Sequence, residues 1–344
     1  MEGQKVLCLK DCPNNYEFNG IDLIKFFCAY LVCMIHVPLF QGFDPSFEVL
    51  GFALKNGIAR IAVPFFFSAS AFLLFRKIEL YKLDKVRIKK HCFKLLFLLG
   101  LWITLLIVGF TDQLWYLSGL VIVTLLFSFL FSKRLSFKLI LIISGLLYFV
   151  GMLGDSYSGI MESFLNKVGF ENAKSVLSVI YNQQTRAVYL GIFSALIFFS
   201  IGVLMVYKPI RINMIFAAFG FLLSIALLLF EAFLIRRFWD SYDHNMYISL
   251  IPTTFFLIYI ATHLDLPNNN IYRKLRSIGV LVFFLHIFIY AIIKNAIGTL
   301  NSVFDVDFSK YTFILVVIFV TALAVFIEYL SNKQRFHFLK YLYG

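Results

Sequence analysis

The sequence predicts an all-α integral membrane protein, a polytopic bundle of about ten transmembrane helices. Hydrophobic residues make up 61% of the 344 residues and charged residues only 15%, whereas about 25% is usual for a soluble domain. The mean hydropathy is +0.86, and apolar runs long enough to cross a bilayer recur along the whole chain. The net charge of +12 comes from basic residues clustered in short loops, a pattern that the positive-inside rule and anionic lipids produce. We therefore expect membrane lipids as partners and no nucleic acid.

Each predicted span is an apolar run between polar boundaries. The first run follows the polar residues 1–19, the third begins where a basic loop ends, and the sixth follows the polar stretch 154–185. The fifth is the shortest and lies between polar stretches that contain glycine. Charged or polar residues separate the remaining runs in the same way. In chain order the ten predicted spans are 20–40, 58–75, 92–110, 114–131, 137–153, 187–206, 213–235, 246–263, 278–294 and 311–330.

The distribution of loop charges predicts the orientation of these spans. The strongest basic cluster lies between the second and third spans, which places that loop in the cytoplasm; its members are Arg76, Lys77, Lys82, Lys85, Arg87, Lys89, Lys90 and Lys94. Alternating outward from this loop puts most of the 31 Lys and Arg residues on the same side. We expect a multi-pass protein of the inner or plasma membrane with both termini inside. Its parts are a cytoplasmic segment 1–19, a membrane domain 20–330 and a cytoplasmic tail 331–344, with no soluble domain appended.

The first predicted span carries ionisable residues on one helical stripe. Lys25 and His36 are eleven positions apart, close to three helical turns, so their side chains share a face about 16 Å apart along the axis. Asp22 precedes Lys25 by three positions and falls on nearly the same face. Because ionisable groups at membrane depth are costly, this stripe predicts a polar cavity inside the bundle.

The second predicted span opens with Arg60 and contains Pro64, which frees a backbone carbonyl inside the helix. Ser68 and Ser70 offer hydroxyls that can satisfy such a carbonyl. With the amino terminus inside, Arg60 and His36 fall on the outer side and Lys25 on the inner side. A histidine suits general-base chemistry near neutral pH, and an arginine suits stabilisation of an oxyanion.

These segments carry a family resemblance. The pattern Asp22-x-x-Lys25-x10-His36, followed by Arg60-x-x-Val-Pro-Phe-Phe-Phe-x-x-Ser70, resembles the acyltransferase-3 family of integral membrane acyltransferases. Leu114-Trp115-Tyr116-Leu117, Leu285-His286 and the ten-span layout agree with it. Lys25 stands where the family usually has arginine, and Ala71 stands where glycine is common. The chain resembles a standalone member without the soluble esterase-like domain of some relatives. Some amino-acid racemases carry a membrane domain of this kind, which has been linked to amino-acid uptake.

The resemblance implies a membrane-bound O-acyltransferase that moves an acyl group, above all acetyl, from cytoplasmic acyl-CoA to a hydroxyl of a cell-envelope or secreted glycan. The catalytic residues would be His36 and Arg60, and Lys25 with Asp22 would hold the CoA end. Acceptor contacts would come from Ser68, Ser70, Trp115 and Tyr116. We expect acyl-CoA as a co-substrate, a carbohydrate or lipid-linked glycan as acceptor, no tightly bound cofactor and no metal site. A homodimer is allowed.

Several alternatives stay open at this point. His36 and His286 have a packing interpretation, Arg60 can be an interface anchor, and Trp115 with Tyr116 can form an aromatic belt at the outer interface. Lys25 can extend towards the interface or pair with Asp22. The alternative function is a membrane transporter or flippase for an amino acid or lipid-linked sugar, and a third is a non-catalytic assembly partner. Turnover of a CoA thioester would distinguish an acyltransferase from these.

Overall fold

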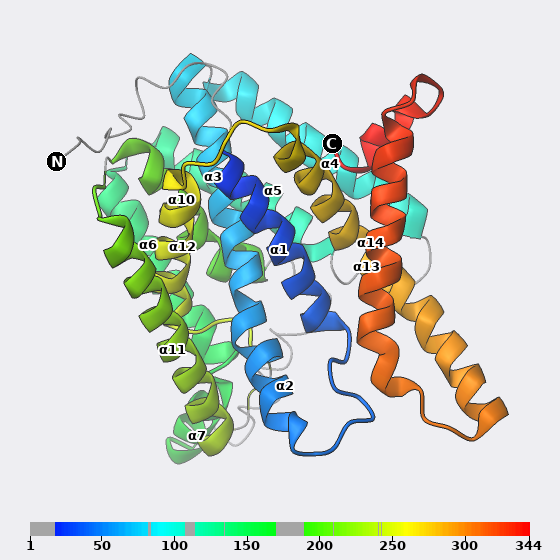
Figure 1. The fold of residues 1–344 in the computed structure, drawn as a ribbon. Coiled ribbons are helices and arrows are strands. Elements are labelled where there is room, and N and C mark those ends of the chain that lie inside the picture. Colours follow the sequence, from blue (N-terminus) through cyan, green and yellow to red (C-terminus); the bar gives the residue numbers. More distant parts are fainter. Residues whose placement is uncertain are drawn as a thin grey trace.

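The structure is a computed structural model in which every described helix belongs to one bundle (Figure 1). It describes residues 18–81, 84–106, 114–133, 135–169, 189–208, 210–239, 241 and 243–344. All regular elements in these ranges are helices, which confirms the predicted all-α class. The predicted segment 1–19 lies outside the described residues up to position 17.

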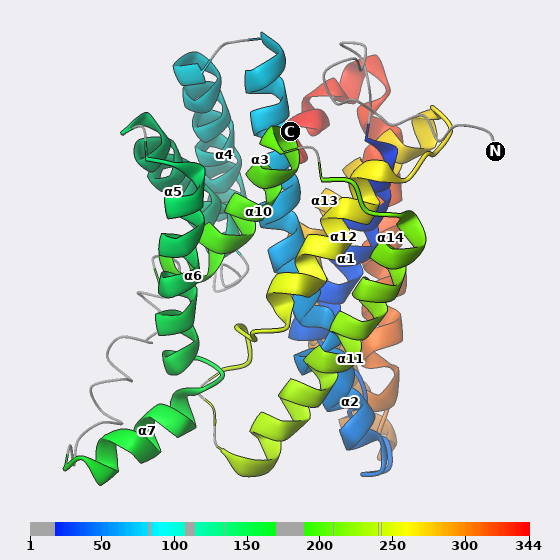
Figure 2. The same cartoon turned by 90° about the vertical axis from the view of Figure 1, so that its left-hand side faces the viewer.

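The helices follow one another with short connections. In chain order they are α1 (Asn19–His36), α2 (Phe47–Asn56), η1 (Ile58–Ile61), α3 (Ala62–Tyr81), α4 (Asp84–Leu106), α5 (Trp115–Ser132), α6 (Phe137–Gly154), α7 (Ser158–Lys167), η3 (Leu190–Ser194, a π-helical turn), α10 (Ala195–Tyr207), α11 (Met214–Phe238), α12 (Leu250–His263), α13 (Asn270–Phe304), η4 (Ser309–Tyr311), α14 (Thr312–Ser331) and η5 (Gln334–Leu342). Short α2 and α7 lie at one end of the bundle, and the start of α4 and the carboxyl-terminal residues lie at the other (Figures 1 and 2).

Eight helical segments within the described residues are long and apolar enough to cross a membrane. They are Asn19–His36, Phe47–Glu79, Trp115–Ser132, Phe137–Gly154, Leu190–Tyr207, Met214–Phe238, Asn270–Phe304 and Ser309–Ser331. These segments coincide with eight of the ten predicted spans, which supports a helical membrane protein.

The other two predicted spans, the third and the eighth, have no counterpart among these eight segments. The third, 92–110, overlaps α4 from residue 92 to residue 106, and its last four residues lie outside the described part of the chain. α4 begins eight residues earlier, in a run rich in Lys and Arg, and it is not among the eight apolar segments. The eighth, 246–263, is the shorter helix α12 of 14 residues. The short helices α2 and α7 were not predicted as elements at all.

Local sequence explains where several helices begin. Asn213 and Asn269 each precede a helix and accept a hydrogen bond from the backbone N–H two residues on, at 2.8 and 3.0 Å. Ser136, before α6, accepts a hydrogen bond from the backbone N–H of Leu139, three residues on, over 3.3 Å. Side-chain acceptors at this position satisfy N–H groups that a helix start leaves unpaired.

Glycines allow the central helices to approach closely. A Cβ at Gly202 of α10 would overlap the backbone carbonyl oxygen of Ser68 in α3. A Cβ at Gly279 of α13 would lie 3.1 Å from the Cα of Phe26 in α1. Small residues at such crossings let backbones meet within a membrane bundle. The contacts fix α1 against α13 and α3 against α10, which are the helices that position the site.

Candidate functional site: a basic cavity

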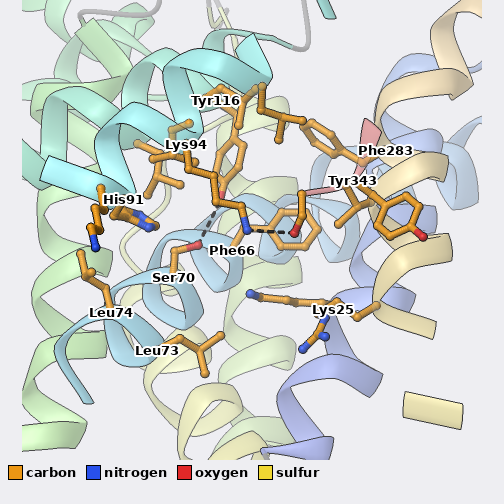
Figure 3. Close-up of a pocket in the computed structure, with 18 of the residues that line it drawn as sticks. Lys25, Phe66, Ser70, Leu73, Leu74, His91, Lys94, Tyr116, Phe283 and Tyr343 are labelled. Atoms are coloured by element: carbon orange, nitrogen blue, oxygen red, sulfur yellow. Dashed lines mark hydrogen bonds between the residues drawn. The ribbon is translucent and has the colours of Figure 1, made fainter. Parts of the chain in front are cut away.

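A cavity of about 700 Å³ opens at the end of the bundle where α3 ends and α4 begins. Its walls come from α1, α3, α4, α5, α13 and the carboxyl-terminal residues (Figure 3). Six basic side chains line it: Lys25, Lys77, Arg87, Lys90, Lys94 and Arg276. No Asp or Glu of the described residues is part of this lining. Concentrated positive charge of this kind attracts anions from solution.

The face of α4 explains four of the polar groups in the cavity wall. Arg87, Lys90, His91 and Lys94 follow one another at intervals of three, one and three residues. Residues three, four and seven positions apart lie on one face of a helix. The same run that indicated a cytoplasmic loop is therefore a helical face turned into the cavity.

Two interactions orient cations at the cavity. Arg276 donates to the carboxylate of the buried Asp22 over 3.2 Å. Lys94 donates to the carbonyl oxygen of Gly344 over 2.8 Å, which brings the last residues of the chain to the cavity wall. The ion pair between Asp22 and Arg276 joins α1 to α13.

The inner wall of the cavity is aromatic and uncharged. Phe66, Tyr116 and Phe283 meet there, with ring centroids 5.7–5.9 Å apart. The hydroxyls of Ser70 and Tyr116 are 3.4 Å apart (Figure 3). Ser70 and Tyr116, two of the four residues predicted to contact the acceptor, therefore line the same cavity as Lys25. Because Tyr116 is buried here, it does not belong to an exposed aromatic belt.

His36 lies beside a second histidine. The rings of His36 and His286 are 5.4 Å apart between centroids. Nδ1 of His286 is 2.7 Å from the carbonyl oxygen of Phe283, and since a carbonyl only accepts, Nδ1 carries the proton. Nε2 of His286 is buried without a hydrogen-bond partner in the described structure. A packing role for His286 therefore explains the hydrogen bond of Nδ1 but not the buried, unpaired Nε2.

Lys25 and His36 do not line one continuous cavity. The basic cavity includes Lys25 and ends at the aromatic wall, and His36 is not among its lining residues. Phe283 belongs to that wall, and its ring lies 6.3 Å from that of His286. The predicted polar face of the first span is thus divided between a basic cavity and a histidine pair.

Arg60 is buried in a different network. Its guanidinium donates to Asn245 over 2.5 Å and to Asn56 over 3.0 Å, and it lies 3.6 Å from Asp243. Asn245 in turn donates to the buried carboxylate of Asp155 through its backbone and its side chain. Arg60 therefore anchors the segment between α11 and α12.

Ser68 and Trp115 also lie away from the cavity. The Ser68 hydroxyl donates to the backbone oxygen of Phe198 over 2.7 Å, which joins α3 to α10. Trp115 packs on Phe67 with centroids 6.4 Å apart. Neither side chain is part of the cavity lining.

Comparison with known proteins identifies three relatives named as racemases. An amino-acid racemase of Enterococcus faecalis is 25% identical over 349 residues, covering 93% of this chain and 47% of its own length. A second amino-acid racemase of that organism is 29% identical over 72% of this chain and 36% of its own. A serine/alanine racemase of Enterococcus gallinarum is 25% identical over 69% of this chain and 36% of its own. This chain spans less than half the length of these relatives. No family model and no solved structure matches it.

These relatives correct the predicted family and reaction. Their names describe isomerases, so the resemblance to acyltransferase-3 proteins and the predicted acyltransferase that modifies envelope polysaccharide with acetyl-CoA are wrong by this comparison. None of the three names refers to a transporter or flippase either. The short motifs that suggested acyl transfer identify residue types and spacing, and those do not fix a reaction. The individual residue contacts and the homodimer stay predictions.

Proposed function

We propose that this chain acts in amino-acid racemization as a multi-pass membrane protein, and that its share is to bind the amino acid. The similarity to three racemases, which extends over 69–93% of the chain, carries this proposal. The printed name of one relative specifies serine and alanine. We therefore take serine and alanine as the first candidate ligands.

The basic cavity supports this proposal chemically. An amino acid carries a carboxylate at neutral pH, and charge-assisted hydrogen bonds from Lys or Arg hold carboxylates well. Lys25 and Arg276 offer such donors. The hydroxyls of Ser70 and Tyr116 lie deeper in the same cavity and suit a polar side chain such as that of serine.

The orientation is part of the proposal. Lys77, Arg87, Lys90 and Lys94 lie at the end of the bundle where the cavity opens, and such clusters remain in the cytoplasm. The amino acid would therefore enter from the cytoplasm. Both ends of the membrane domain would lie on that side as well.

Equilibrium binding of radiolabelled L-serine and L-alanine to the purified chain in lipid nanodiscs tests the proposal. We expect saturable binding, reduced about tenfold or more by Lys25→Gln because one charge-assisted hydrogen bond contributes about 1.5–3 kcal/mol. Lys294→Gln is the matched control, since Lys294 is exposed on α13 and does not line the cavity. Absence of saturable binding, or equal affinity of the Lys25→Gln variant, would refute the proposal.

A further inference from the structure

His91 is a histidine in the wall of the basic cavity. It lies on α4 among Arg87, Lys90 and Lys94 of the same helix. Lining the same cavity are Lys25 from α1, Lys77 from α3 and Arg276, paired with Asp22, from α13; the residues of α5 that line the cavity are Tyr116, Leu117 and Leu120, which carry no charge. His91 thus shares the cavity with cations from its own helix and from three others.

One nitrogen of His91 has no partner. Nε2 is buried and lacks a hydrogen-bond partner in the described part of the chain. Buried polar atoms in folded proteins are nearly always paired with protein, water or ligand. An unpaired nitrogen on a residue of a cation-lined cavity is therefore a position that a ligand atom or a water can satisfy.

The same surroundings keep the imidazole neutral. Burial, then Lys94, Lys25 and Lys77, lower the pKa of His91 to about 4. A bound anion raises the pKa of His91, because an opposite charge within a few ångströms favours the protonated ring. His91 then becomes a donor on both nitrogens and Nε2–H gains an acceptor.

We propose that the basic cavity binds oxyanions of two negative charges, such as sulfate or a phosphate group, together with one proton that His91 takes up from solvent. The geometry that carries this is the unpaired Nε2 of a histidine that lines a cavity with six cations and no Asp or Glu among its described lining residues, where Lys94 pairs with the carboxyl-terminal Gly344. The proposal concerns the same cavity as the proposed function and rests on its binding anions. It adds a class of ligand and a dependence on pH.

The expected magnitude follows from linkage. When binding takes up one proton, the affinity rises tenfold for each unit by which the pH falls, between the pKa values of the bound and free states. Since burial and the nearby lysines hold the pKa of free His91 at about 4, the dependence should extend across pH 5 to 7. Sulfate is the appropriate probe because it does not titrate in this range.

Isothermal titration calorimetry of sodium sulfate into the full chain in nanodiscs measures the affinity for sulfate and the number of protons taken up with it. We expect tighter binding at pH 5 than at pH 7 by more than tenfold. Titration in two buffers of different ionisation enthalpy should report close to one proton taken up per sulfate near pH 5.5. His91→Gln should abolish the proton uptake and flatten the pH profile.

Two further variants make the result specific. His91→Lys places a permanent charge at the same position, so its affinity should be high and constant across pH 5 to 7. His337→Gln, on an exposed residue of η5 outside the cavity lining, should keep the wild-type profile. Absence of sulfate binding, a flat wild-type profile, or proton uptake that persists in His91→Gln would overturn the proposal.

The two proposals fail separately. Sulfate binding with proton uptake, in a protein that shows no saturable binding of serine or alanine, would refute the proposed function and support the proton-coupled site. If the protein binds serine or alanine but binds sulfate without proton uptake, the proposed function is supported and the proton-coupled site is refuted.

Discussion

Substitution of Gly202 by alanine should destabilise the bundle by about 1–3 kcal/mol. The added Cβ would overlap the backbone carbonyl of Ser68 and lie 2.9 Å from the Cβ of Ala71, so α3 and α10 must separate. Overpacking of this kind costs about 1–3 kcal/mol, and loss of the hydrogen bond from Ser68 to Phe198 adds about 1 kcal/mol. Alanine regains about 1 kcal/mol of helix propensity, which offsets the lost hydrogen bond.

A matched glycine supplies the control. No atom lies within 4 Å of a Cβ built on Gly145 of α6, so Gly145→Ala should leave stability unchanged or raise it by about 0.5–1 kcal/mol. Thermal unfolding of the three proteins in one detergent, followed by loss of the monodisperse peak in size-exclusion chromatography, compares them directly. Gly202→Ala should unfold several degrees below the wild type. Equal stability of Gly202→Ala and Gly145→Ala would refute the close approach of α3 and α10.

Three other perturbations have defined outcomes. Burial and then Asp243 raise the pKa of Asp155 to about 6 from 3.8, so this carboxyl contributes stability below about pH 4 that is lost as the pH rises through 6. Asp155→Asn should remove that part of the pH dependence of thermal unfolding, and an unchanged profile would contradict the assignment. Asp22→Asn removes the carboxylate paired with Arg276, so sulfate should bind severalfold more tightly by calorimetry; weaker binding would contradict the electrostatic reasoning. Trp102→Phe removes the hydrogen bond from Nε1 to Leu342, so limited proteolysis should cleave the last residues faster than in the wild type, and an equal rate would contradict this anchoring.

The fold class was predictable because the bilayer imposes a strong pattern on sequence. The predicted spans 114–131 and 137–153 agree within one residue at each end with α5 and α6. The start of α4 could not be found by hydropathy, because Arg87, Lys90 and Lys94 face a cavity. Their spacing at three and four residues carried the missing signal, since it indicates a helical face and not a loop.

The site was only partly predictable. Of the ionisable stripe on the first span, Lys25 lines a polar cavity and His36 does not. The partners of the stripe could not be derived, because Asp22 meets Arg276 across 254 positions of sequence, and His36 meets His286 across a similar span. Contacts of such separation depend on how helices pack, and a single sequence does not encode that pairing in any local pattern.

Six cations that share a cavity of about 700 Å³ have a consequence for any measurement on this protein. In chloride solution, mobile counterions should accompany these side chains, because like charges that share one cavity repel one another. A ligand then enters by exchange with chloride, and its observed affinity weakens as salt is added. Replacing chloride by a bulky organic anion such as gluconate should therefore strengthen ligand binding even at constant ionic strength.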